Sequence, residues 1–183
     1  MSRIITNTIL ILLCGLCFGC RTSVPTMEDG GVVRHNTGTD SPKVISSTEI
    51  KSFKGEFSLA TMVFEEENEL EGNVYQMSAV WDRDTVKANI KWYDRYGGGE
   101  NRAFETDRSF LIKLQDIVAK YDLAQYNGYY YEVAGLPDRY GASIVIDYVS
   151  GEQIYAFDNQ SCFLPVDAME ELLHLFLLSG DDL

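Results

Sequence analysis

The sequence predicts an α+β fold, in which two helices pack on one face of a mainly antiparallel β-sheet. Three patterns favour this fold. Residues 86–92 alternate apolar and polar side chains, which is typical of an antiparallel strand with one wet face. Residues 110–121 carry apolar side chains at helical spacing. Residues 143–157 hold two short strand-like runs joined by Ser150 and Gly151, which is the pattern of a hairpin.

The folded part is expected to start near Ile50, and strand-like segments come before the first helix. These segments span residues 56–64, 74–81, 86–92 and 101–105. The alternation in the second and third segments places these residues on one face of each strand: Tyr75, Met77, Ala79 and Trp81, then Val86, Ala88, Ile90 and Trp92. The connections between them are an acidic loop over residues 65–72, a turn over 82–84 and a glycine turn over 97–99.

Both predicted helices carry one apolar stripe and have recognisable start signals. Asp107 or Ser109 can cap the first helix. Asp167 and Glu170 have the spacing of a capping box, which predicts that the second helix begins there and continues to about Leu178. The buried side of the second helix is expected to hold Met169, Leu172, Leu173, Phe176 and Leu177. The two helices can therefore cover the same face of the sheet.

The order strand, strand, helix occurs twice, in residues 86–122 and residues 142–179. A constant offset matches these pairs: Gly98 with Gly151, Ala103 with Ala156, Phe104 with Phe157, Glu105 with Asp158, Phe110 with Phe163, and Leu111 with Leu164. One such unit cannot bury its apolar face alone, whereas two units side by side can form a single sheet. The matches are explained either by an internal duplication of a ββα repeat or by chance similarity, and the sequence leaves both open.

The chain is acidic, with 15 basic and 28 acidic residues and a formal net charge of −13. A surface of that charge repels nucleic acid and anionic headgroups, so no nucleic-acid partner is expected. Acidity of this kind suits a cationic partner, and it also serves solubility alone.

The first twenty residues have the organisation of a secretory signal. Arg3 supplies a positive charge, residues 9–16 form an apolar run, and the small residue Gly19 stands directly before Cys20. This pattern resembles the lipobox of bacterial lipoproteins, although Cys17 and Phe18 stand where that motif most often has Leu and then Ala or Ser. The resemblance implies cleavage before Cys20, lipid on its thiol, and a place in the cell envelope facing the periplasm or the exterior. The alternative is a secreted protein that is cut elsewhere.

The signal divides the chain into three parts. Residues 1–19 are the predicted signal peptide. Residues 20–46 are rich in Ser, Thr, Gly, Pro and Asp, so they are predicted to be a flexible tether. Residues 47–183 are predicted to be a single α+β domain, and this part holds no apolar run of the length that a membrane span needs.

The four cysteines and two histidines point to no catalytic or metal chemistry. Cys14 and Cys17 lie in the signal and Cys20 is the predicted lipid site, which leaves Cys162 without an intramolecular partner. Its apolar surroundings favour a structural thiol over a nucleophile. His35 lies in the tether and His174 in a helix. The sequence has no Walker or Rossmann phosphate loop, zinc-spaced ligand pair or G-x-S-x-G elbow, so it predicts no cofactor, no metal and no catalytic residue.

Aromatic residues give the strongest indication of a binding surface. The candidate surface consists of Trp92, Tyr93, Tyr96, Tyr129 and Tyr131. Tyr and Trp combine apolar area with a polar group, so they are enriched at protein interfaces, and they also stack on sugar rings. If the Tyr run at 129–131 is a strand, Tyr129 and Tyr131 share a face and Tyr130 lies opposite. The expected partner is an unidentified protein or glycan.

Together these observations predict a non-catalytic binding or interaction module, anchored by its N-terminal lipid outside the cytoplasm. The layout of signal, tether and one α+β domain is similar to that of many small bacterial lipoproteins, and this similarity implies location rather than activity. Two alternatives remain open. One is an envelope hydrolase that uses carboxylates such as Asp82, Asp84 or Asp94. The other is a structural subunit of an envelope complex.

Overall fold

A computed structural model describes residues 26–28, 31–36, 40–58, 74–93, 98–134 and 141–179 of the 183-residue chain. The strands are β1 (Thr26–Glu28), β2 (Gly31–Asn36), β3 (Ile50–Ser58), β4 (Val74–Asp82), β5 (Thr85–Tyr93), β6 (Gly99–Thr106), β7 (Tyr130–Ala134), β8 (Ala142–Tyr148) and β9 (Gln153–Asp158). The helices are α1 (Ser109–Lys120), the 3-10 turn η1 (Leu123–Tyr126) and α2 (Val166–Leu178). The predicted signal peptide, Cys20, Tyr96, Asp94 and the acidic loop over residues 65–72 lie outside the described residues.

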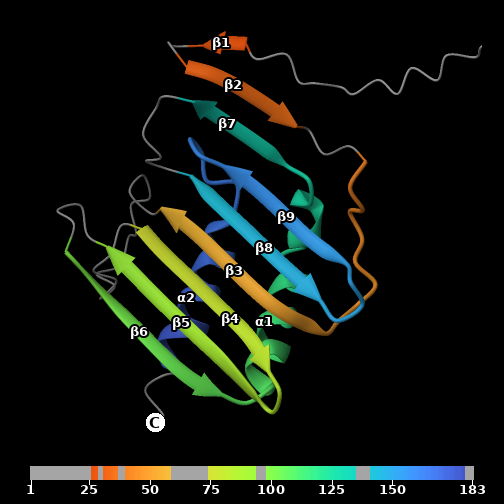
Figure 1. Ribbon diagram of the computed structural model, residues 1–183, viewed down its shortest axis with the longest axis vertical. Coiled ribbons are helices and arrows are strands. Elements are labelled where there is room, and N and C mark those ends of the chain that lie inside the picture. The colour runs from red at the N-terminus through yellow and green to blue at the C-terminus, as the bar shows by residue number, and fades with distance from the viewer. Residues whose placement is uncertain are drawn as a thin grey trace, which may run out of the picture.

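The predicted α+β fold is confirmed. Within the described ranges, nine strands form one sheet in the order β1-β2-β7-β9-β8-β3-β4-β5-β6. Neighbouring strands are antiparallel except β7 and β9, which pair in parallel. Figure 1 looks onto one face of the sheet, with α1 and α2 behind it. We call the face opposite these helices the open face.

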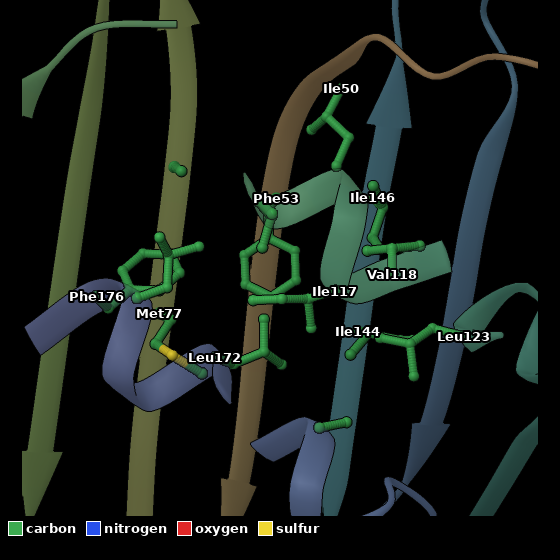
Figure 2. Packing of buried hydrophobic residues seen from close by; sticks show 14 of the residues in the cluster. Ile50, Phe53, Met77, Ile117, Val118, Leu123, Ile144, Ile146, Leu172 and Phe176 are labelled. Atoms are coloured by element: carbon green, nitrogen blue, oxygen red, sulfur yellow. The ribbon is translucent and has the colours of Figure 1, made fainter. Parts of the chain in front are cut away.

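The hydrophobic core lies between the sheet and the two helices. Helix α1 packs on β3, α2 packs on β5, and the helices also contact each other. Figure 2 shows Phe53 of β3 and Phe176 of α2 in this layer, beside Met77 and Leu172. The predicted apolar stripes are largely confirmed. Leu177, which was predicted to be buried, is half-buried. The residues that are buried are Phe110, Leu111, Leu114, Ile117 and Val118 in α1, and Ala168, Met169, Leu172, Leu173, Leu175 and Phe176 in α2.

Alternation along the central strands orients their side chains as predicted. In β4 and β5, Tyr75, Met77, Ala79, Val86, Ala88 and Ile90 are buried. The predicted turn between β8 and β9 is also present, and Gly151 there has a φ of 88°. Glycine adopts this left-handed conformation without the steric cost that a Cβ atom would add.

Strand β3 begins earlier than the predicted strand at residues 56–64. It starts at Ile50, and its pairing with β8 shifts register between Ile50 and Ser52. Because this bulge breaks the two-residue period, Ile50 and Phe53 both reach the core although their spacing does not alternate. Residues 59–64 lie outside the described residues.

Part of the predicted tether over residues 20–46 has regular structure. Residues 26–28 and 31–36 form β1 and β2, and β2 pairs with β7 at the edge of the sheet. Residues 40–46 run alongside the β8–β9 hairpin (Figure 1). There the backbone N–H of Ser46 donates to the Glu152 carboxylate over 2.8 Å. The amino-acid composition of this segment predicts a tether, because composition carries no information on backbone pairing with a strand far along the chain.

The order strand, strand, helix is present twice, as β5-β6-α1 and β8-β9-α2. Two of the residue pairs matched at constant offset differ in position between the two units. Phe104 is buried in β6, whereas its match Phe157 is only half-buried and lies on the open face of β9. Phe110 lies inside α1, but its match Phe163 comes before α2. The topology repeats without these residue equivalences.

The helix starts differ from one another. Asp107 accepts a hydrogen bond from the backbone N–H of Ser109 over 2.7 Å, so it satisfies one free donor at the start of α1. The capping box predicted at Asp167 is wrong. Helix α2 begins at Val166 after Pro165, and its N-cap makes no side-chain hydrogen bond, so Asp167 lies within the first turn.

Candidate binding surface

The four predicted aromatic residues that the structure describes lie at one end of the sheet but are far apart. Strand register places Trp92, Tyr75, Phe57, Ala142, Asp158 and Tyr131 in one row across it. Trp92 and Tyr131 are five strand spacings apart in this row, or roughly 24 Å at about 4.8 Å per strand. The structure therefore does not bring the predicted residues together as one patch.

The predicted residues are also divided between the two faces of the sheet. Trp92 and Tyr129 are half-buried against the core. Tyr93 lies on the open face, where Lys91 Nζ is 4.7 Å from its ring centroid. Tyr131 pairs with Asp158, whose side chain is buried on the helix side, so Tyr129 and Tyr131 share the face opposite Tyr130. This orientation is as predicted for the Tyr run.

A different aromatic group occupies the open face. We call Tyr130, Tyr155 and Phe157 the aromatic cluster. The ring centroids of Tyr130 and Phe157 are 5.2 Å apart with planes at 27°, and those of Tyr130 and Tyr155 are 6.5 Å apart with planes at 17°. Tyr155 is 39% exposed, which makes it the exposed end of this near-parallel stack.

Local sequence patterns predict only part of this cluster. Tyr155 and Phe157 alternate with Ile154 and Ala156 in β9, so their orientation away from the core could have been predicted. Their meeting with Tyr130 depends on the parallel pairing of β7 with β9, which places Tyr130 beside Phe157. No local pattern indicates a contact between strands so far apart in the chain.

A groove of about 510 Å³ lies beside the cluster. Its lining includes Tyr130 and Tyr155, the apolar side chains of Pro42 and Ile45, and the amide of Gln153. Mostly apolar surface with a few polar groups is the usual composition of a binding site for a small ligand.

The edges of this groove are held by hydrogen bonds. The Asn127 side chain is buried, donates to the carbonyl of Pro42 over 2.9 Å and accepts from the backbone N–H of Tyr155 over 2.9 Å. Glu152 accepts from the backbone N–H groups of Ser46 and Ser47 and from the Ser150 hydroxyl, at 2.8 to 2.9 Å. These bonds, with Ser46 as the main cause, hold the pKa of Glu152 below its ordinary value. The groove is therefore formed before any ligand binds.

The centre of the open face is polar. A shallow hollow of about 400 Å³ there is lined by residues that include Lys54, Ser78, Asn89 and Ser143. Asn89 donates to Asn101 over 2.7 Å, which links β5 to β6. The open face thus has an aromatic side over β7 and β9 and a polar centre over β3 to β6.

Comparison with protein-family models, with curated proteins and with solved structures finds no match. No helix in the described part of the chain has the length and apolarity needed to cross a membrane.

Two of the three carboxylates considered for hydrolysis, Asp82 and Asp84, lie on an exposed turn, and Asp94 is outside the described residues. Asp82 pairs with Lys87 at 2.6 Å, and Asp84 is exposed in the same β4–β5 turn, where Arg83 has a φ of 59°. The described residues contain no group of three or more His, Cys, Asp or Glu side chains that could hold a metal ion. His174 is exposed on α2.

Asp158 and Cys162 lie together where β9 leads into α2. Asp158 is 3% exposed, and its carboxylate accepts from the backbone N–H groups of Gln160 and Ser161 and from the Tyr129 hydroxyl, at 2.8 to 2.9 Å. The Cys162 Sγ is 3.4 Å from Met169 Sδ, and burial raises the pKa of the thiol. A raised pKa opposes thiolate formation, so Cys162 has the environment of a structural residue.

We predict that titration of Tyr129 makes the folded protein less stable at alkaline pH. Burial, and then its hydrogen bond to Asp158, raises the pKa of Tyr129 from 10 to about 12. The folded state favours the neutral phenol. The phenol's contribution to the free energy of unfolding is therefore complete below pH 10 and is lost as the pH rises from 10 to 12. Tyr129→Phe is expected to cost about 1 kcal/mol at pH 8, and this difference should shrink by pH 11.5.

The measurement is urea unfolding followed by circular dichroism at pH 8 and pH 11.5. Tyr126→Phe is the matched control, because the ring of Tyr126 packs on the same Phe163 as the ring of Tyr129. A Tyr129→Phe cost that stays constant across this pH range would contradict the role given to the phenol.

Proposed function

We propose that this protein is a lipid-anchored binding module of the bacterial cell envelope that faces the periplasm or the exterior and uses the open face of its sheet to bind. One observation carries the binding role. Both described helices cover the same face, and the opposite face carries the aromatic cluster beside a groove whose edges are already held. Exposed aromatic rings beside a preformed groove favour binding, because little conformational freedom is lost when a partner arrives.

The proposed anchor rests on the sequence of residues 1–20. Cys20 stands six positions before Thr26, the first residue of β1. Six residues span at most roughly 20 Å when fully extended. A lipid on Cys20 would therefore hold the β1 edge of the sheet close to the membrane surface.

The anchor is tested by mass spectrometry of the mature N-terminus, extracted from membranes of cells that express the full chain. We expect a peptide that begins at Cys20 and carries a diacylglyceryl-sized addition, and we expect Cys20→Ala to abolish it. Cys17→Ala is the matched control, because it removes a nearby thiol and should leave the modification in place. An unmodified N-terminus in the wild type would overturn the anchor.

A further inference from the structure

We infer that the groove beside the aromatic cluster binds an uncharged glycan, with one pyranose ring stacked on Tyr155. This inference rests on the proposed binding function and deepens it by naming the class of ligand. The ring of Tyr155 is the exposed end of a stack whose planes lie within 17° to 27° of one another. The π face of such a ring is negative, so it attracts the polarised C–H bonds on the flat side of a sugar.

Polar side chains line the same groove as this ring. Ser41, Gln153 and Glu152 line the same groove as Tyr155 and supply a hydroxyl, an amide and a carboxylate. Gln153 and Tyr155 alternate with the buried Ile154, so both point to the open face. An apolar ring edged by hydrogen-bonding groups matches a sugar, which has C–H bonds on its faces and hydroxyls on its rim.

Charge decides which glycans fit. Glu152 lines the groove, Glu132 Oε2 accepts the Tyr130 hydroxyl at 2.5 Å, and the chain as a whole carries a formal charge of −13. These carboxylates repel sulfated or uronic-acid polymers, which leaves uncharged sugars as the favoured class.

The rigidity of the site favours the binding of a ligand whose contacts with the protein are weak. Asn127 ties the backbone of Tyr155 to Pro42, and Glu152 ties the β8–β9 turn to Ser46 and Ser47. Because the groove does not have to form on binding, the modest energy of ring stacking is not spent on ordering the protein.

The test is isothermal titration calorimetry of the full mature chain in a detergent without a sugar headgroup. Chitohexaose and cellohexaose are the uncharged probes, and hexagalacturonic acid is the anionic one. We expect at least one uncharged oligomer to bind and the anionic oligomer to give no heat. Tyr155→Ala should weaken binding about tenfold, which corresponds to about 1.4 kcal/mol. Tyr155→Trp should retain binding, because it keeps an aromatic face.

Ile112→Ala is the matched surface control, since Ile112 is exposed on α1, on the other side of the molecule. It should leave the affinity unchanged. Circular dichroism of each variant verifies that the fold is intact. The inference is overturned if neither uncharged oligomer binds at millimolar concentration, or if folded Tyr155→Ala binds as tightly as the wild type.

A photo-crosslinking amino acid at position 155, used in cells, separates this inference from the proposed function. A glycan adduct supports both. A protein adduct without sugar binding overturns the glycan and leaves the binding module standing. If no adduct forms and no oligomer binds, both the inference and the binding role of this face fail.

Discussion

Replacing Phe176 with alanine is expected to lower the free energy of unfolding by about 4 kcal/mol. Phe176 is fully buried and joins the helices to the sheet. Its ring centroid lies 5.0 Å from that of Phe110 in α1, edge to face, and 5.9 Å from that of Phe53 in β3. Alanine leaves a cavity between three elements, and those elements cannot close it without moving relative to one another.

The measurement is urea unfolding at neutral pH, followed by circular dichroism. Leu178→Ala is the control on the same helix, because Leu178 is 60% exposed and should change stability by less than about 0.5 kcal/mol. A loss below about 2 kcal/mol for Phe176→Ala would mean that the core is less tightly packed around α2 than the structure indicates.

Replacing Asp158 with alanine should cost about 3 kcal/mol. The substitution leaves the backbone N–H groups of Gln160 and Ser161 and the Tyr129 hydroxyl without their acceptor. A hydrogen bond to a charged group contributes about 1.5 to 3 kcal/mol, and relaxation and water recover part of the sum of these three bonds. These bonds hold the turn from β9 to α2, so their loss also weakens the packing of α2 on the sheet.

Asp158→Asn separates charge from geometry, since it keeps one carbonyl acceptor and should lose about half as much stability. Asp116→Ala, at an exposed position of α1, is the matched control for removing a carboxylate. Thermal unfolding of the variants at pH 7 gives the comparison. A cost for Asp158→Ala equal to that of Asp116→Ala would refute the structural role of the buried carboxylate.

Much of the fold could be predicted because its signals are local. Apolar and polar residues alternate through β4 and β5, and each helix repeats its apolar positions every three or four residues. Both patterns arise because one face of each element is buried. The sequence pattern therefore indicates which residues face the core. The turn at Gly151 is local for a different reason, since a positive φ favours glycine.

The capping box at Asp167 has the correct spacing, but the helix begins earlier, at Val166 directly after Pro165. The other predictions that did not hold involve interactions between distant segments. Strand β3 was predicted too late, because its bulge interrupts the alternation that marks a strand. Residues 31–36 form β2 by pairing with β7, and residues 26–28 form β1 by pairing with β2.

The candidate surface shows the same division. An aromatic binding surface was predicted, with Trp92, Tyr93, Tyr96, Tyr129 and Tyr131 as its members. Tyr129 lies against the core, and the exposed stack is formed by Tyr130, Tyr155 and Phe157. Composition and local order could indicate that aromatic residues gather in this part of the chain. They could not indicate which of these residues stay in solvent.

By itself, the sequence determined the α+β class, the alternation of the central strands and the two helical stripes. The tertiary structure alone decided the strand order, the parallel pairing of β7 with β9 and the aromatic cluster that this pairing creates. The physical reason is range. Side-chain periodicity depends on neighbours within a few residues, whereas strand pairing depends on the free energy of burying surfaces that are far apart in the chain.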